Sequence, residues 1–160
     1  MKSTRKILAA IFALALAAIT VLGGLQMTGS ESTTLPVVSA VAGQQPTISK
    51  PAGPAPKELT FEDVIVGTGA EVLPTSTLTV HYTLMAWSNG NIVESSWGGQ
   101  PATFALAQVV EGWQKGLPGA KEGGRRLLVL PPEMGYGAAG AGPIGPNETL
   151  IFAVDIIGVS

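Results

Sequence analysis

The most regular pattern of apolar and polar residues lies in STLTVHYTLMAW, residues 76–87. Its large apolar side chains occupy every second position, so they share one face of an extended chain. They are Leu78, Val80, Tyr82 and Leu84. Asn89-Gly90 follows, a pair that accepts the positive φ angles of a tight hairpin turn. The pattern predicts a half-buried strand over 76–87 and a hairpin that returns along residues 91–97.

Three other stretches are rich in β-branched and aliphatic residues, which favour strands. They are LTFEDVIVGTGAEV (59–72), RRLLVLP (125–131) and TLIFAVDIIGV (149–159). Only QVVEGWQKGL (108–117) has helical spacing, with Val109 and Trp113 four residues apart. Gly112 and Gly116 weaken this helix by about 1 kcal/mol each relative to alanine, so it needs a tertiary surface to pack on. The chain is expected to be an α+β protein with about five antiparallel strands and one short helix.

The N-terminus has the order of charged and apolar residues found in membrane-targeting segments. Lys2, Arg5 and Lys6 precede an apolar run, residues 7–25. The run is long for a signal peptide and close to the ~20 residues that span a bilayer. Ala40-Val41-Ala42 fits the small-x-small rule for cleavage but lies well beyond the run. Residues 1–25 are therefore predicted to be a signal peptide or a retained membrane anchor, with both alternatives open.

Either alternative places the rest of the chain outside the cytoplasm, secreted, periplasmic or anchored to the outer face of the cytoplasmic membrane. Residues 26–57 are rich in Ser, Thr, Pro, Gly and Gln. Such a segment has little apolar surface to offset the entropy lost on ordering, so it is predicted to be a disordered linker. The folded domain is expected to occupy residues 58–160.

Charge and residue content exclude several classes of function. Residues 58–160 hold four Lys and Arg against ten Asp and Glu, an acidic balance that offers no electrostatic surface to nucleic acid. The sequence has no cysteine, which excludes disulfides, thiolate metal sites and cysteine nucleophiles. His81, the only histidine, lies on the strand face opposite Tyr82, without an accompanying acidic cluster. No metal site and no cofactor is expected.

The stretch GYGAAGAGPIGP, residues 135–146, begins with the pattern G-x-G-x-x-G. A dinucleotide-binding loop needs a helix directly after these glycines. Here Pro143 and Pro146 follow, and the next predicted element is a strand, which excludes that interpretation. The stretch is instead interpreted as a loop with Tyr136 at its base and Ile144 near its far end.

Five segments follow one another along the chain in an order and spacing that match one known family. They are VHYT (80–83), ESSW (94–97), QVVEGWQKGL (108–117), GGRRLLVLPPEMGYG (123–137) and GPNETLIFAVDII (145–157). Together they resemble the FK506-binding-protein (FKBP) family of peptidyl-prolyl cis–trans isomerases, over nearly all of residues 59–159. The resemblance implies a half-barrel of five or six antiparallel strands wrapped around one short helix, with an apolar cleft between helix and sheet. It also implies proline-containing polypeptides as substrates and macrolides as inhibitors. We expect a monomer.

The resemblance implies functional roles for ten residues. Those at the reacting bond are Tyr82, Glu94, Trp113, Tyr136 and Phe152. Those expected to bind the substrate around it are Val93, Phe104, Val109, Val110 and Ile144. Trp113 corresponds to the floor of the cleft, and the Tyr136 hydroxyl to a donor for a substrate carbonyl.

Three positions depart from the family pattern. Val93-Glu94 stands where the family usually has Phe-Asp, Ala102 replaces a common aromatic residue, and the loop between Tyr136 and Ile144 has no histidine. The cleft is therefore expected to be wider and less aromatic than usual. Two hypotheses follow. The first is a rotamase that assists the folding of extracytoplasmic proteins by rotating X-Pro bonds. The second is a non-catalytic module or chaperone that holds proline-containing segments.

Overall fold

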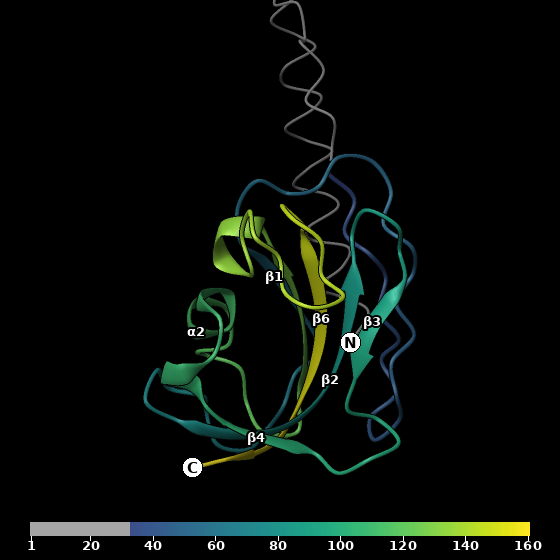
Figure 1. Cartoon of the computed structure of the whole chain (residues 1–160). Helices are drawn as coiled ribbons and strands as arrows, with labels where there is room; N and C mark the ends of the chain where they lie inside the picture. Colours follow the sequence, from purple (N-terminus) through teal and green to yellow (C-terminus); the bar gives the residue numbers. More distant parts are fainter. Residues whose placement is uncertain (1–32) are drawn as a thin grey trace, which may run out of the picture. The chain divides into compact units, whose positions relative to one another are not determined.

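Six antiparallel strands form one sheet in the computed structural model, which describes residues 33–160. The strands are β1 (Thr60–Ile65), β2 (Thr77–Ala86), β3 (Ile92–Ser95), β4 (Ala102–Ala105), β5 (Arg125–Leu130) and β6 (Leu150–Val159). They lie in the order β1-β5-β6-β2-β3 (Figure 1). β3 pairs with the second half of β2 and β4 with its first half. The predicted α+β class and antiparallel sheet are confirmed.

The hairpin between β2 and β3 forms where Asn89-Gly90 predicts it. Gly90 has a φ of 65°, and the Asn91 N–H donates a hydrogen bond of 2.9 Å to Asn89 Oδ1. The alternation predicted along β2 holds in its first half, where Leu78 and Val80 are buried in the core beneath the helix. The second half differs, because all of residues 83–86 are buried and Met85 belongs to a second core. β4 was not predicted from the residue pattern, since four residues are too few to show a period.

One short α-helix, α2 (Glu111–Gly116), follows a 3-10 turn, η1 (Leu106–Gln108). Its two glycines permit close packing on β5. A β-carbon at Gly112 would lie 2.2 Å from Leu130 Cγ, and one at Gly116 would lie 2.7 Å from Leu128 Cδ2. The same residues that lower helix propensity therefore let the helix backbone rest directly on the sheet.

Arg126 fixes the end of this helix to the sheet. Its Nη1 donates to the carbonyl oxygens of Gly116 at 2.8 Å and Pro118 at 3.1 Å. Its Nε and Nη2 form a bidentate pair with the carboxylate of Asp63, at 2.8 and 3.1 Å. Charge-assisted bonds of this kind satisfy helix carbonyls that have no partner within the helix.

Two apolar cores lie on opposite faces of the sheet. The inner core joins α2 to the concave face. Its buried residues are Val72, Leu78, Val80, Leu84, Leu106, Trp113, Leu117, Ala120, Leu128, Leu130, Leu150, Phe152, Val154 and Ile156. The outer core lies on the other face and contains Val38, Met85, Trp87, Leu127, Val129, Ile151 and Ala153.

The structure differs from the sequence-based expectation for residues 33–57, which were predicted to be part of a disordered linker. They form an N-terminal hairpin with bridges between Thr34 and Ala52 and between Val38 and Ile48. Val38 is 3% exposed in the outer core, and Leu35, Ile48 and Ala55 pack around it. The folded unit thus includes residues 33–57 and does not begin at residue 58. A few well-placed apolar residues outweigh the polar composition, because the sheet offers them a second apolar face.

A buried arginine holds the N-terminal hairpin to the sheet. Arg125 is fully buried and forms a bidentate ion pair with Asp155, at 2.6 Å through Nε and 2.8 Å through Nη2. Its remaining donors reach the backbone oxygens of Ser39 and Gln44, each at 2.6 Å. One side chain therefore joins β5, β6 and both sides of the hairpin turn.

The predicted signal or anchor segment, residues 1–25, and the start of the predicted linker lie outside the described residues. Within residues 33–160, no helix has both the length and the apolar character needed to span a membrane.

Candidate functional site

Four aromatic rings meet at the open end of the inner core. The ring centroid of Trp113 lies 5.8 Å from that of Tyr82, 5.8 Å from Phe104 and 5.3 Å from Phe152. All three neighbours stand nearly perpendicular to the indole, at 81° to 89°. Edge-to-face contacts of this kind are the favoured aromatic geometry and keep rings apart at fixed angles. The indole therefore forms a rigid floor with aromatic walls.

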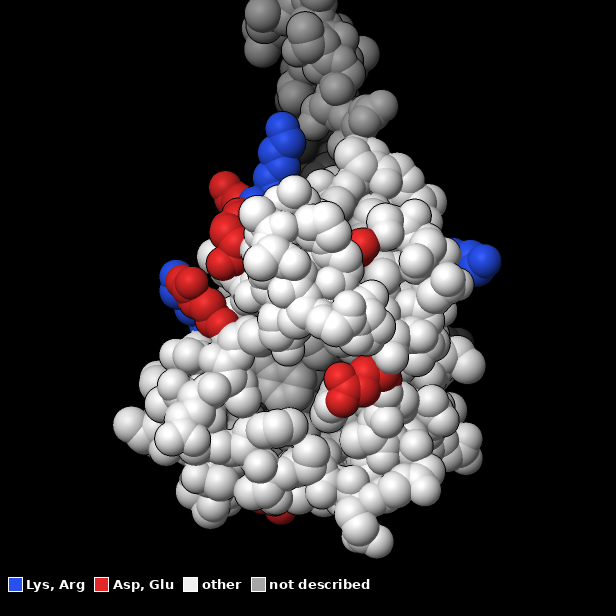
Figure 2. Space-filling view, in the orientation of Figure 1, with Lys and Arg blue, Asp and Glu red and all other residues white. Residues whose placement is uncertain are grey.

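Other elements contribute aliphatic side chains to the same place. Val93 comes from β3, and Val109 and Val110 precede α2. Ile144 comes from the loop of residues 135–146, called the glycine-rich loop below. All four are partly buried against the inner core. Figure 2 shows a hollow in this face of the domain, bordered by mostly uncharged surface. The indole N–H of Trp113 is buried and has no acceptor within residues 33–160. The hollow is thus a cleft lined mainly by apolar side chains.

The loop after η2 (Pro132–Met134) carries Tyr136 and Ile144. It is closed by its own backbone bonds, between Ala141 and Ile144 at 2.9 and 3.0 Å and from Asn147 to Gly137 at 2.9 Å. Ile144 packs on the inner core, whereas Tyr136 is 40% exposed. Tyr136 therefore lies at the surface, with its side chain available to a bound ligand.

The polar part of the site is a hydrogen bond between two of the predicted residues. Tyr82 Oη donates to Glu94 Oε1 at 2.7 Å. Burial raises the pKa of Tyr82 well above its ordinary value of about 10, and the hydrogen bond to Glu94 and the negative charge of that carboxylate raise it further. Tyr136 adds to this shift in the pKa, so the two tyrosines lie near enough to interact. The single hydroxyl proton of Tyr82 is therefore used in the hydrogen bond to Glu94.

We expect Tyr82 to stay protonated at a pH where free tyrosine ionises. In a Tyr136→Phe variant Tyr82 is the only tyrosine, so its phenolate absorbance can be titrated directly. The folded state keeps a proton that the unfolded chain releases above about pH 10, so the free energy of unfolding should fall as the pH rises beyond that value. Tyr82→Phe should remove this part of the dependence. Glu94→Gln should lower the pKa of Tyr82. A phenolate that forms near pH 10 would contradict the contact with Glu94.

Ser96 supports Tyr82 and was not among the predicted site residues. Its hydroxyl accepts a hydrogen bond from the Tyr82 N–H at 2.8 Å, and its own N–H donates to the Tyr82 carbonyl at 3.0 Å. The same hydroxyl lies 3.0 Å from His81 Nδ1, and the His81 ring stacks on Trp97 at 4.3 Å. The hairpin register could have identified Ser96, because it places residues 95 and 96 opposite residues 83 and 82.

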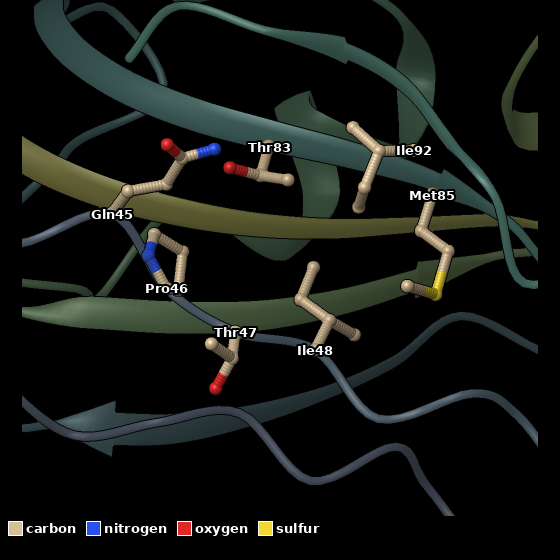
Figure 3. A pocket seen from close by; sticks show the side chains of 7 residues that line it. All are labelled: Gln45, Pro46, Thr47, Ile48, Thr83, Met85 and Ile92. Atoms are coloured by element: carbon tan, nitrogen blue, oxygen red, sulfur yellow. The ribbon is translucent and has the colours of Figure 1, made fainter. Parts of the chain in front are cut away.

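Eight of the ten predicted residues lie in or against the inner core, and Glu94 joins them through its hydrogen bond to Tyr82. The tenth, Tyr136, is exposed on the loop that carries Ile144. A second concavity, of ≈ 400 Å³, lies between the N-terminal hairpin and β2 and β3 (Figure 3). It is lined by Gln45, Pro46, Thr47, Ile48, Thr83, Met85 and Ile92. This lining includes no titratable side chain and none of the predicted residues, so the aromatic cleft is the candidate site.

Known proteins resemble both the sequence and the fold. Residues 69–157 match the family described as FKBP-type peptidyl-prolyl cis-trans isomerase. A probable FK506-binding protein of Corynebacterium glutamicum is 44% identical over 115 residues, which cover 71% of this chain and 98% of that protein. An FK506-binding protein of Neisseria meningitidis serogroup A is 47% identical over 106 residues, covering 63% of this chain and 95% of that protein.

The solved crystal structure of AtFKBP13 has the same architecture, with a TM-score of 0.60 and 34% identity over 66% of this chain and 96% of that one. The resemblance drawn from the five sequence segments and the half-barrel it implies are confirmed. The chain belongs to the FKBP-type peptidyl-prolyl cis–trans isomerase family.

Proposed function

We propose that the chain, as a monomer, rotates X-Pro bonds of polypeptides in the cleft floored by Trp113. The observation that carries this proposal is the arrangement of Tyr82, Phe104 and Phe152 around the buried indole, each within 5.8 Å of it. A prolyl ring is compact and apolar, and it fits a cleft with a flat aromatic floor and aliphatic edges. The ten predicted residues keep their assigned roles as part of this proposal.

The chemistry needs no nucleophile. Rotation about an X-Pro bond crosses a barrier of about 18–20 kcal/mol because it breaks amide resonance. The twisted amide has a smaller dipole than the planar one, so an apolar cleft that removes water from the bond favours the twisted form. An enzyme that binds the twisted form better than either planar form lowers the barrier by that difference.

One polar side chain orients the substrate in this scheme, and a hydrogen-bonded pair supports the wall of the cleft. Since Tyr82 donates its proton to Glu94, the phenol available to donate to a substrate carbonyl is that of Tyr136. Tyr136 is 40% exposed and lies two residues after η2, which suits contact with a chain lying across the cleft. The Tyr82–Glu94 bond holds the wall of the cleft in place while the substrate turns.

A refolding assay tests the activity on a polypeptide. We expect small amounts of the full-length chain to accelerate the slow, proline-limited refolding phase of a substrate protein, and FK506 to abolish the effect. Val93→Phe should keep or raise the rate, because it restores bulk to the cleft wall. Binding of the unfolded substrate without acceleration would favour the non-catalytic holding module, which the replacements at Val93 and Ala102 otherwise support.

We also propose that the protein works outside the cytoplasm, where it assists the folding of other proteins, with its ordered unit intact from residue 33. The small-x-small site, residues 40–42, lies in the turn of the N-terminal hairpin between the two carbonyls held by Arg125. Cleavage there would detach Leu35 and Val38 from the outer core. This supports a retained anchor or cleavage before residue 33. Intact mass of the protein from membrane and secreted fractions tests it, and a mature chain that begins at Gly43 would contradict it.

A further inference from the structure

We propose that the cleft selects prolines flanked by a positively charged residue, lysine or arginine, over prolines flanked by an acidic one. The inference rests on the proposed isomerase function and assigns its substrate class. It follows from the charges on the elements that form the cleft.

The elements around the cleft are almost devoid of positive charge. β2, β3, β4, η1, η2, the glycine-rich loop and β6 contain no lysine or arginine. The lysine of α2, Lys115, pairs with Glu111 on the same helix. Arg125 and Arg126 on β5 are buried and paired with carboxylates. No free cation on these described elements offsets the acidic side chains of the cleft.

Two carboxylates remain on these elements. Glu94 lies on β3 and is exposed; its Oε1 accepts the Tyr82 hydroxyl, and its Oε2 has no partner within residues 33–160. Glu133 lies in η2, three residues before Tyr136, and is also exposed. Figure 2 shows acidic side chains on this face of the domain, one of them at the edge of the hollow. A chain that crosses the cleft beside Tyr82 therefore meets the negative charge of Glu94.

The expected discrimination is moderate and depends on salt. A peptide that places a unit charge about 4 Å from a carboxylate in water changes its affinity by a factor of about five. A positive charge raises the affinity and a negative charge lowers it. The Debye length falls from about 30 Å at 0.01 M salt to about 3 Å at 1 M, so the preference should fade at high salt. Because Glu94 also holds Tyr82, an isosteric amide is the appropriate substitution. Glu94→Gln removes the charge and keeps an oxygen for the tyrosine hydroxyl.

The test compares peptides that differ only in the charge beside proline. One series is Ala-Xaa-Pro-Phe and a second is Ala-Leu-Pro-Xaa, with Xaa as Lys, Gln or Glu. Cis–trans exchange is measured by NMR with the full-length chain in mild detergent, at low and high salt. We expect kcat/KM in the order Lys, Gln, Glu in at least one series, with about fivefold or more between Lys and Glu at low salt. Glu94→Gln should reduce the Lys-to-Glu ratio.

Glu62→Gln is the matched control, because it removes the same charge from exposed β1 at the opposite end of the sheet order. Its Lys-to-Glu ratio should equal that of the wild type. Equal rates for Lys and Glu peptides in both series, with exchange clearly accelerated, would overturn this inference and leave the isomerase function standing. Absence of acceleration for every peptide would overturn the proposed function itself.

Discussion

An Arg125→Ala variant is expected to lose about 3–5 kcal/mol of its free energy of unfolding. The guanidinium is fully buried and makes four hydrogen bonds, two to Asp155 and one each to the carbonyls of Ser39 and Gln44. Alanine would leave a carboxylate with 9% side-chain exposure without its partner and free both carbonyls of the hairpin turn. Removal of one member of a buried ion pair is costly because the remaining charge has lost its solvent and its partner.

Denaturant unfolding of the full-length chain, followed by tryptophan fluorescence, measures this loss. Arg125→Lys should restore only part of it, since an ammonium cannot form a bidentate pair and reach two further carbonyls. Lys115→Ala, which breaks the exposed helical pair with Glu111, is the control and should cost less than about 1 kcal/mol. A similarly small cost for Arg125→Ala would mean that the N-terminal hairpin does not depend on this side chain.

A Trp113→Ala variant is expected to lose about 10- to 100-fold in kcat/KM for an X-Pro peptide. The indole is the common neighbour of Tyr82, Phe104 and Phe152, so its removal deletes the floor of the cleft and loosens three walls. Loss of one large apolar contact is worth about 1.5–3 kcal/mol, and each 1.36 kcal/mol in the barrier is about tenfold in rate.

The same change costs stability, so activity must be referred to the folded fraction. Truncation of a buried tryptophan typically costs about 3–5 kcal/mol. Trp87→Ala is the matched control, because Trp87 is buried in the outer core on the opposite face of the sheet. It should destabilise the protein comparably while the folded fraction keeps its activity. An equal loss of activity in the folded fraction of both variants would contradict a specific role of Trp113 in the cleft.

The pattern of apolar residues predicted an element correctly where its period allowed only one kind of secondary structure. The large apolar residues at every second position of β2 and the Asn89-Gly90 turn predicted the central hairpin, because a period of two is typical of a strand. The spacing of residues along the sequence could not show which side chains come together in the site. Trp113, Glu94 and Phe152 lie on different elements, and only the family resemblance predicted their association. In the structure the register of β2 with β3 and β6 places Glu94 and Phe152 on either side of Leu84, and the indole of Trp113 packs against the ring of Phe152.

The ordered structure of residues 33–57 was not predicted, because the prediction rested on the composition of that segment and not on the surface that the rest of the fold offers it. The signal lay elsewhere, in β5, where all six residues are buried. Leu128 and Leu130 face the inner core while Leu127 and Val129 face the outer core. A strand apolar on both faces requires a cover on each, and the single predicted helix could cover only one. The N-terminal hairpin supplies the second cover.

The most direct test of the cleft's function is to locate a prolyl ring on the protein during exchange. An X-Pro peptide with a labelled proline is added to the full-length chain, and NMR records both its cis–trans exchange rate and magnetisation transfer from the ring to protein side chains. We predict accelerated exchange together with transfer from the prolyl ring to the indole of Trp113. Accelerated exchange with the ring located away from Trp113, or contact with Trp113 and no acceleration, would contradict the account.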